Sequence, residues 1–245
     1  MESYPNLMKK EIPTLHRLRL LGVAATAGTL LAGCASETIF QSSFNTQPPG
    51  AVPAAAQAIG TAQVSGDPGS VIIAGPVPGS KENWVRISRG NAQQSQVSTF
   101  QGTLSKTPGA GTYAFLGALF IPSGSGLASV EFDTSAFGSP ASTSFLHLDF
   151  TQDNKVRIND TNDADHIWGS FPRDQFFTLS VNLEITTTSA VAHMALFGTG
   201  TSGNKDFTIP SPFSNFSQQF GQIRVFMGFP WTGSFDATDL LVTHH

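Results

Sequence analysis

The sequence predicts an all-β protein folded as a two-sheet antiparallel jelly-roll sandwich, and three observations lead to this fold class. The 245 residues include 20 phenylalanines and 24 glycines, whereas charged residues make up only 12%, a composition that favours strands and turns. Apolar and polar residues alternate with a period of two in several segments. No stretch sustains the three- and four-residue apolar spacing of an amphipathic helix.

The chain begins with a leader that has the three parts of an export signal. A basic start precedes eleven residues of apolar character, Leu20 to Leu30, which are too few to span a bilayer because that takes about 20. Small residues then lead to Cys34, the single cysteine of the chain. The run Leu-Ala-Gly-Cys at residues 31–34 resembles the lipobox of bacterial lipoprotein signals.

This resemblance covers residues 1–34. It implies that residues 1–33 are removed as a signal peptide and that Cys34 carries the lipid, with residues 34–37 as the anchor. Several acyl chains hold a protein stably on a membrane, where one chain would be marginal. Ala35 follows the cysteine, which in enterobacterial lipoproteins favours the outer membrane over the inner one. We therefore expect a protein of the bacterial cell envelope that is attached to a membrane through its lipid.

The charge left after removal of the leader limits the possible partners. Four of the 13 basic and two of the 17 acidic residues lie in the leader, so residues 34–245 carry 9 and 15, a net charge of −6. No basic block remains, and nucleic acid is not expected as a partner because phosphate contact needs clustered Lys and Arg. Lipidation of the cysteine leaves no disulfide and no thiolate metal site. Residues 38–245 are long enough to bury the core of one domain.

The first part of this domain allows two interpretations. Residues 46–60, rich in proline and alanine, are either a flexible tether or a long loop that follows a first strand at residues 38–45. The aromatic spacing of Phe40 and Phe44, followed by turn residues, favours the strand and loop.

Later segments carry clearer strand patterns. From Phe177 to Ile185 the odd-numbered residues are apolar and the even-numbered ones are mostly polar, and residues 223–229 repeat the alternation opposite Gln222 and Arg224. Residues 113–121 are apolar on both faces, as expected for a strand in the middle of a sandwich. Roughly a dozen such strands in one domain predict two curved sheets, one of which leaves a concave face.

Two of the expected strands carry acidic residues and a histidine. In Val-Glu-Phe-Asp-Thr, Glu131 and Asp133 share a face, and in Phe-Leu-His-Leu-Asp-Phe, His147 and Asp149 share a face with Phe145. A strand rises about 3.3 Å per residue, so each polar pair is roughly 6–7 Å apart, and adjacent strands would gather the four into one cluster. These two strands resemble the paired core strands of legume lectins, which belong to the concanavalin A-like lectin and glucanase superfamily.

The resemblance to legume lectins implies metal ligands, because in that family the glutamate and aspartate of the first strand help to bind manganese and calcium. Glu131, Asp133 and Asp149 are the corresponding candidates here. Residues 135–143 contain no carboxylate, however, and Phe145 stands at the family's histidine position. Calcium takes six to eight oxygen ligands. We therefore predict no cofactor. Calcium is the one metal that we keep as an alternative.

The same superfamily includes β-glucanases with a nucleophilic glutamate, an aspartate and an acid glutamate on one strand. Retaining hydrolysis needs two carboxyl groups about 5–5.5 Å apart. Glu131 and Asp133 match the first two positions, but Ser135 or Ala136 stands where the acid is needed. His147 could act as an acid or a base, although a histidine on a packed sheet is more often structural.

Three residues outside these two strands complete the candidate set. Arg157 alternates with apolar neighbours and pairs either with Asp149, with a sugar carboxylate, or with other groups of an ordinary ion-paired face. Trp168 and Trp231 lie in expected loops, where they either stack on sugar rings or close the ends of the core.

The sequence therefore predicts a lipid-anchored envelope protein whose lectin-like domain binds a polysaccharide, an oligosaccharide or another envelope component without catalysis. One alternative is a glycoside hydrolase or polysaccharide lyase whose acid comes from another strand. The other is a structural surface lipoprotein without a ligand. The candidate face consists of Glu131, Asp133, His147, Asp149, Arg157, Trp168 and Trp231.

Overall fold

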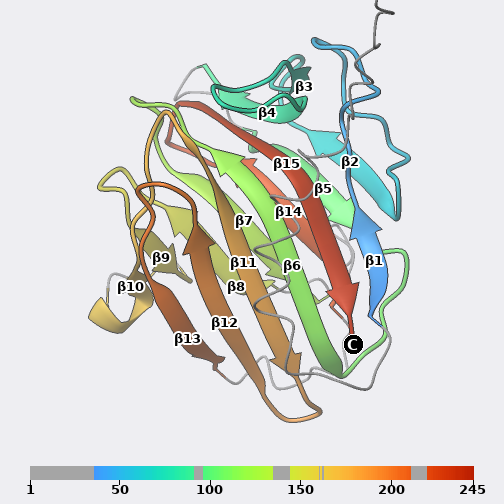
Figure 1. The fold of residues 1–245 in the computed structure, drawn as a ribbon, viewed down its shortest axis with the longest axis vertical. Helices are drawn as coiled ribbons and strands as arrows, with labels where there is room; N and C mark the ends of the chain where they lie inside the picture. The colour runs from blue at the N-terminus through green and yellow to red at the C-terminus, as the bar shows by residue number, and fades with distance from the viewer. Residues whose placement is uncertain (1–35, 91–95, 135–143, 160, 162, 211–219) are drawn as a thin grey trace, which may run out of the picture. The chain divides into compact units, whose positions relative to one another are not determined.

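The computed structural model describes residues 36–90, 96–134, 144–159, 161, 163–210 and 220–245. In these segments, fifteen strands form two antiparallel sheets, and the only helix is the single 3-10 turn η1 (Ala164–His166) (Figure 1). The prediction of an all-β, two-sheet antiparallel fold is confirmed. No helix in these segments is long and apolar enough to cross a membrane. The leader and Cys34 lie outside the described residues.

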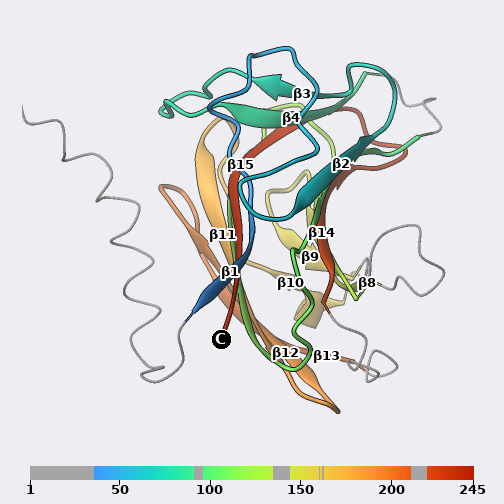
Figure 2. The ribbon, with the colours of Figure 1, turned by 90° about the vertical axis from the view of Figure 1, so that its right-hand side faces the viewer.

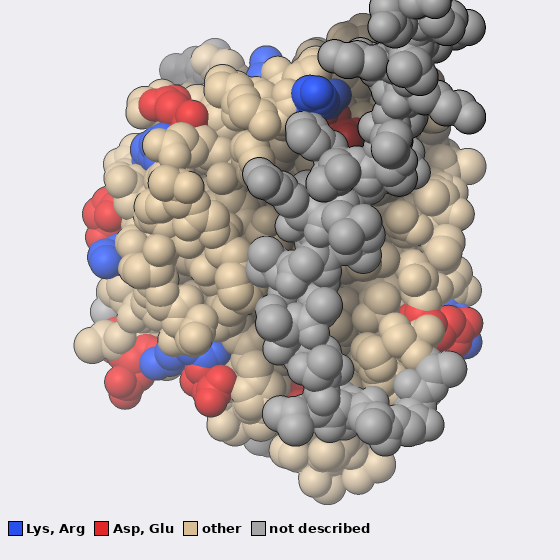
Figure 3. All heavy atoms as spheres, viewed as in Figure 1, with Lys and Arg blue, Asp and Glu red and all other residues tan. Residues whose placement is uncertain are grey.

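The first sheet has eight strands. Seven follow the order β13-β12-β11-β6-β15-β4-β3, and β1 pairs with β15. Figure 3 shows the outer face of this sheet, on which the visible Lys, Arg, Asp and Glu side chains lie mainly toward the margins. The strands are β1 (Glu37–Gln41), β3 (Val71–Ala74), β4 (Trp84–Arg89), β6 (Gly111–Phe120), β11 (Phe176–Ile185), β12 (Ala190–Phe197), β13 (Asn204–Ile209) and β15 (Gly233–His244).

The second sheet has seven strands in the order β10-β9-β8-β7-β14-β5-β2. Figure 2 views the two sheets from the side, as two layers. The strands are β2 (Thr61–Ser65), β5 (Ser98–Thr103), β7 (Ala128–Asp133), β8 (Ser144–Phe150), β9 (Val156–Ile158), β10 (Ile167–Trp168) and β14 (Gln222–Met227).

The period-two alternation places one side of each sheet in the core. On β11 the odd-numbered residues from 177 to 185 are all buried, and the residues between them are half-buried or exposed, as predicted. The strand β6, apolar on both faces, lies between β11 and β15 near the centre of its sheet. On β14 the buried set ends at Met227, because the strand ends there. The expectation that Phe229 continues this face is wrong, since its side chain is 67% exposed.

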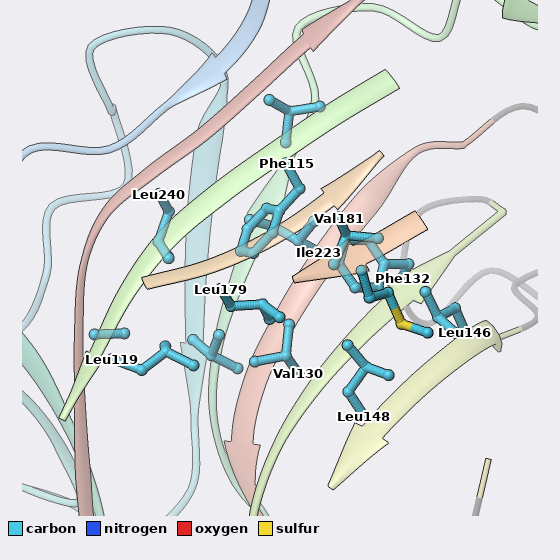
Figure 4. Close-up of a cluster of buried hydrophobic side chains, with 14 of the residues drawn as sticks. Phe115, Leu119, Val130, Phe132, Leu146, Leu148, Leu179, Val181, Ile223 and Leu240 are labelled. Carbon is cyan, nitrogen blue, oxygen red and sulfur yellow. The ribbon is translucent and has the colours of Figure 1, made fainter. Parts of the chain in front are cut away.

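Both sheets supply the core between them. Figure 4 shows Phe115, Leu179 and Val181 of the eight-stranded sheet above Phe132 and Leu148 of the seven-stranded sheet. Burial of each such side chain contributes roughly 1.5–3 kcal/mol, relative to its exposure to water.

Residues 37–41 form β1, and residues 42–60 then run as a loop that returns to this strand at a bridge between Gln41 and Ile59. The ring of Phe40 crosses the core to the backbone of the other sheet at Gly102. A Cβ atom added at Gly102 would lie 2.4 Å from that ring, so the close approach of β1 to β5 requires glycine there.

Candidate functional site

The outer face of the seven-stranded sheet carries three rows of mostly polar side chains that run across the strands. Residues at matching register in antiparallel strands stand side by side on one face. The middle row, for example, joins His147 on β8, Glu131 on β7, Arg224 on β14 and Gln101 on β5. We name the three rows the polar face. It consists of Arg157, Asp149, Ser129 and Phe226; His147, Glu131, Arg224 and Gln101; and Ser144, Asp133 and Gln222.

Asp149 is the centre of the first cluster on this face. Its Oδ2 accepts hydrogen bonds from Arg157 Nη2 at 2.7 Å and Nε at 3.2 Å. Its Oδ1 lies 2.9 Å from His147 Nε2 and accepts a hydrogen bond from Ser129 Oγ at 2.6 Å. The aspartate side chain is 1% exposed, whereas those of His147 and Arg157 are 17% and 21% exposed. The carboxylate therefore lies beneath the groups that it holds in place.

Arg224 is the centre of the second cluster. Its Nη2 lies 2.5 Å from Glu131 Oε2, and its Nε donates to Asp133 Oδ2 at 2.9 Å. Gln222 Nε2 donates to the same Asp133 oxygen at 2.6 Å. The two carboxylates are 8% and 0% exposed, and the arginine is 17% exposed. The structure thus brings Glu131 and Asp133 onto one face, as expected, but around an arginine that sequence reasoning did not select.

Burial of Glu131 raises the pKa of its carboxyl group, and the charge of Asp133 raises it further. A hydrogen bond with Ser144 and the charges of Arg224 and His147 oppose this rise. Desolvation disfavours the ionised form of a carboxylate, and a nearby like charge does the same. Glu131 therefore holds its proton more tightly than an ordinary glutamate does.

The arrangement does not fit the calcium site considered for Glu131, Asp133 and Asp149. Among the residues that the structure describes, no group of three or more His, Cys, Asp or Glu side chains is placed to hold a metal ion. Each of these carboxylates instead faces N–H donors of arginine. A hard cation needs an open set of oxygen ligands, and these oxygens are turned toward positive groups of the protein itself.

Phe226 is a second site residue that sequence reasoning missed. Its half-buried ring lies on the polar face, with the His147 ring 5.5 Å away between centroids and the Arg224 guanidinium carbon 5.6 Å from the ring centroid. The alternation of β14 was readable in the sequence and already placed Arg224 opposite the core residues. The pairing of β14 with β7, about 90 residues away, left no local signal.

The expectation that Phe145 shares a face of β8 with His147 and Asp149 is wrong. The register of β7 and β8 shifts between Phe132 and Asp133, so that Asp133 faces Ser144 and Phe145 is an extra residue. A bulge of this kind turns a side chain to the other face. Phe145 accordingly lies in the core, 1% exposed, with its ring 5.6 Å from that of Phe220.

The two tryptophans are not exposed platforms. Trp168 is 6% exposed and belongs to the hydrophobic core beside β9. Of its two expected roles it therefore closes an end of the core, and its place on the candidate sugar-binding face is wrong. Trp231 is half-buried and packs against the backbone of Gly126. The exposed aromatic side chain of this connection is Phe229. Buried Arg89 lies beneath that ring, with its guanidinium carbon 5.8 Å from the ring centroid.

Comparison with known proteins identifies the fold. No protein-family model matches the chain, and no curated protein sequence does either. Among solved structures, a GH131 β-glucanase catalytic domain from Podospora anserina has a TM-score of 0.50 at 12% identity, covering 84% of this chain and 95% of that one. The GH131 catalytic domain from Coprinopsis cinerea gives 0.48 at 15% identity over 84% and 94%. Lectin II from Ulex europaeus gives 0.43 at 9% identity over 85% and 97%. The described domain is a concanavalin A-like jelly-roll sandwich.

Proposed function

We propose that the protein binds a glycan on the polar face without cleaving it. The observation that carries this proposal is an ion-paired network on one face of the sheet. It fixes His147 and Arg224 beside the ring of Phe226 and holds Arg157 on Asp149, further along the same face. Sugars offer hydroxyl groups for hydrogen bonds and C–H faces for contact with aromatic rings. A set of fixed polar groups beside one ring matches both features.

The charge of the network favours a neutral glycan over an acidic one. Three carboxylates and two arginines face one another on the polar face, where Arg157 pairs with Asp149 and Arg224 with Glu131 and Asp133. The positive charges are therefore already matched within the protein. An anionic sugar would have to compete with buried carboxylates for the same guanidinium groups.

The same ion pairs argue against retaining hydrolysis by the carboxylates of the polar face. That reaction needs one carboxylate as nucleophile and one protonated carboxyl as acid, whereas Asp133 and Asp149 are each fixed by arginine. The acid position expected at Ser135 or Ala136 lies outside the described residues. One observation favours catalysis as the second candidate: the pKa of Glu131 is raised, and His147 stands opposite it.

A glycan array probed with the full chain in mild detergent tests the main proposal. We expect binding to neutral oligosaccharides, weakened about tenfold or more by Phe226→Ala or Arg157→Ala. The matched control is His193→Ala, on the outer face of the other sheet, and it should bind as the parent does. No binder above background would instead support the structural lipoprotein. Cleavage of a bound glycan that is lost in Glu131→Gln and His147→Ala would establish the enzymatic alternative.

We also propose that Cys34 anchors the protein in the outer membrane. The strand β1 begins at Glu37, and three residues of chain span at most about 11 Å. A lipid on Cys34 would thus hold this strand close to the membrane surface. Incorporation of a labelled fatty acid, its loss in Cys34→Ala, and fractionation of the envelope membranes test this anchor.

A further inference from the structure

Glu131 and Asp133 place two buried carboxylates next to each other. Both carboxylates lie on the same face of β7, two residues apart, and are 8% and 0% exposed. Two buried negative charges this close repel each other, and the repulsion contributes to the raised pKa of Glu131. Such a pair needs a positive charge beside it.

Arg224 supplies that charge from the neighbouring strand. It stands directly opposite Glu131 in the register of β7 and β14. One guanidinium contacts both carboxylates, through Nη2 to Glu131 and Nε to Asp133. The guanidinium also lies over the ring of Phe226, two residues further along β14, with its central carbon 5.6 Å from the ring centroid.

The groups around Asp133 are of the wrong kind for a metal ion. Its Oδ2 receives N–H groups from Gln222 and Arg224, and an ion at that oxygen would meet two donors where it needs acceptors. Of the two oxygens of this carboxylate, only Oδ1 has no hydrogen-bond partner among the described residues. One oxygen does not make a calcium or manganese site.

We propose that Arg224 takes the place of a divalent cation at this face, so that the protein folds and binds its ligand without metal. The guanidinium is a positioning group: it holds Glu131 and Asp133 and is itself 17% exposed beside Phe226. Folding without metal follows from these contacts alone, whereas ligand binding without metal rests on the glycan function proposed above.

Thermal unfolding of the full chain in mild detergent tests the inference without any glycan. We expect the melting temperature to be the same in EDTA, Ca²⁺ and Mn²⁺. Arg224→Ala should lower it by about 10 °C, and millimolar Ca²⁺ or Mn²⁺ should restore part of the loss. Arg157→Ala, which removes the partner of Asp149 alone, is the matched control and should gain no response to metal.

Further variants keep the test decisive if Arg224→Ala does not fold. Arg224→Lys retains the charge and should stay indifferent to metal, whereas Arg224→Gln should acquire a response. A parent protein that loses stability in EDTA and regains it with Ca²⁺ would overturn the proposal. Folded Arg224→Ala and Arg224→Gln variants that ignore both metals would overturn it as well. Absence of glycan binding would count against the proposed function and would leave these melting temperatures unchanged.

Discussion

Two histidine–carboxylate pairs of almost the same length lie on the outer faces of the two sheets. His147 Nε2 is 2.9 Å from Asp149 Oδ1 on the polar face, and His193 Nδ1 is 2.8 Å from Asp206 Oδ1 on the eight-stranded sheet. The aspartate side chain is 1% exposed in the first pair and 78% in the second. Distance alone would rank the pairs as equal, so burial makes the difference between them.

Burial changes what the loss of one partner does. An exposed ion pair contributes about 0–1 kcal/mol because water screens it. Removal of one partner from a buried pair leaves an uncompensated polar group and destabilises by about 3–5 kcal/mol. The buried cluster around Asp149 is costly to keep and lies beside partly exposed side chains, which points to a function. The exposed pair of His193 and Asp206 needs no such explanation.

The largest difference is expected between Asp149→Ala and Asp206→Ala. The first removes the acceptor shared by Arg157, His147 and Ser129, and we expect it to lower the free energy of unfolding by about 3–5 kcal/mol. The second should change it by less than about 1 kcal/mol. Thermal unfolding of both variants in mild detergent measures the two effects. Equal effects would contradict the role given to burial.

A smaller, pH-dependent effect is expected for Glu131→Gln. The folded-state pKa of Glu131 is raised, mainly by burial, so the native state binds this proton more tightly than the unfolded chain does. The resulting stabilisation is fully present below the unfolded pKa of about 4.3 and is lost as pH rises through the folded pKa. Glutamine resembles the protonated form. The variant should therefore match the parent near pH 4 and gain on it toward pH 8.

Unfolding of both proteins across this range measures the trend. Glu184→Gln, at a side chain that is 63% exposed, controls for the loss of one negative charge. A difference between parent and Glu131→Gln that shifts the opposite way with pH would show that the ion pair with Arg224 outweighs desolvation.

Much of the polar face could be predicted from the sequence, because the alternation of side chains between the two faces of a strand depends only on that strand. The alternation in β7 and β8 placed Glu131, Asp133, His147 and Asp149 opposite the core without any knowledge of the neighbouring strands. Arg224 was placed correctly on its own strand for the same reason. Its role depends on which strand lies beside β14, and that pairing is set by packing between distant segments.

Where local pattern and tertiary structure disagreed, the reasons were specific. A bulge turned Phe145 into the core, and strand alternation alone cannot reveal one extra residue. The sequence around Trp168 is typical of a loop, but the short strand β10 pairs with β9 and the tryptophan is buried there. Phe229 is exposed because β14 ends at Met227, whereas the apolar pattern of the sequence continues for two more residues.

The smallest effect is expected for His193→Ala. This variant also tests most directly which of the two sheets carries the ligand. His193 is 39% exposed and contacts the exposed side chains of Asp206 and Glu184, so its loss should change the free energy of unfolding by less than about 0.5 kcal/mol. His147→Ala, in contrast, takes a partner from buried Asp149 and should destabilise by about 1–3 kcal/mol. Unfolding and glycan binding measured on both variants separate the two faces. If His193→Ala abolished binding while His147→Ala preserved it, the ligand would lie on the eight-stranded sheet, and the buried network would serve stability alone.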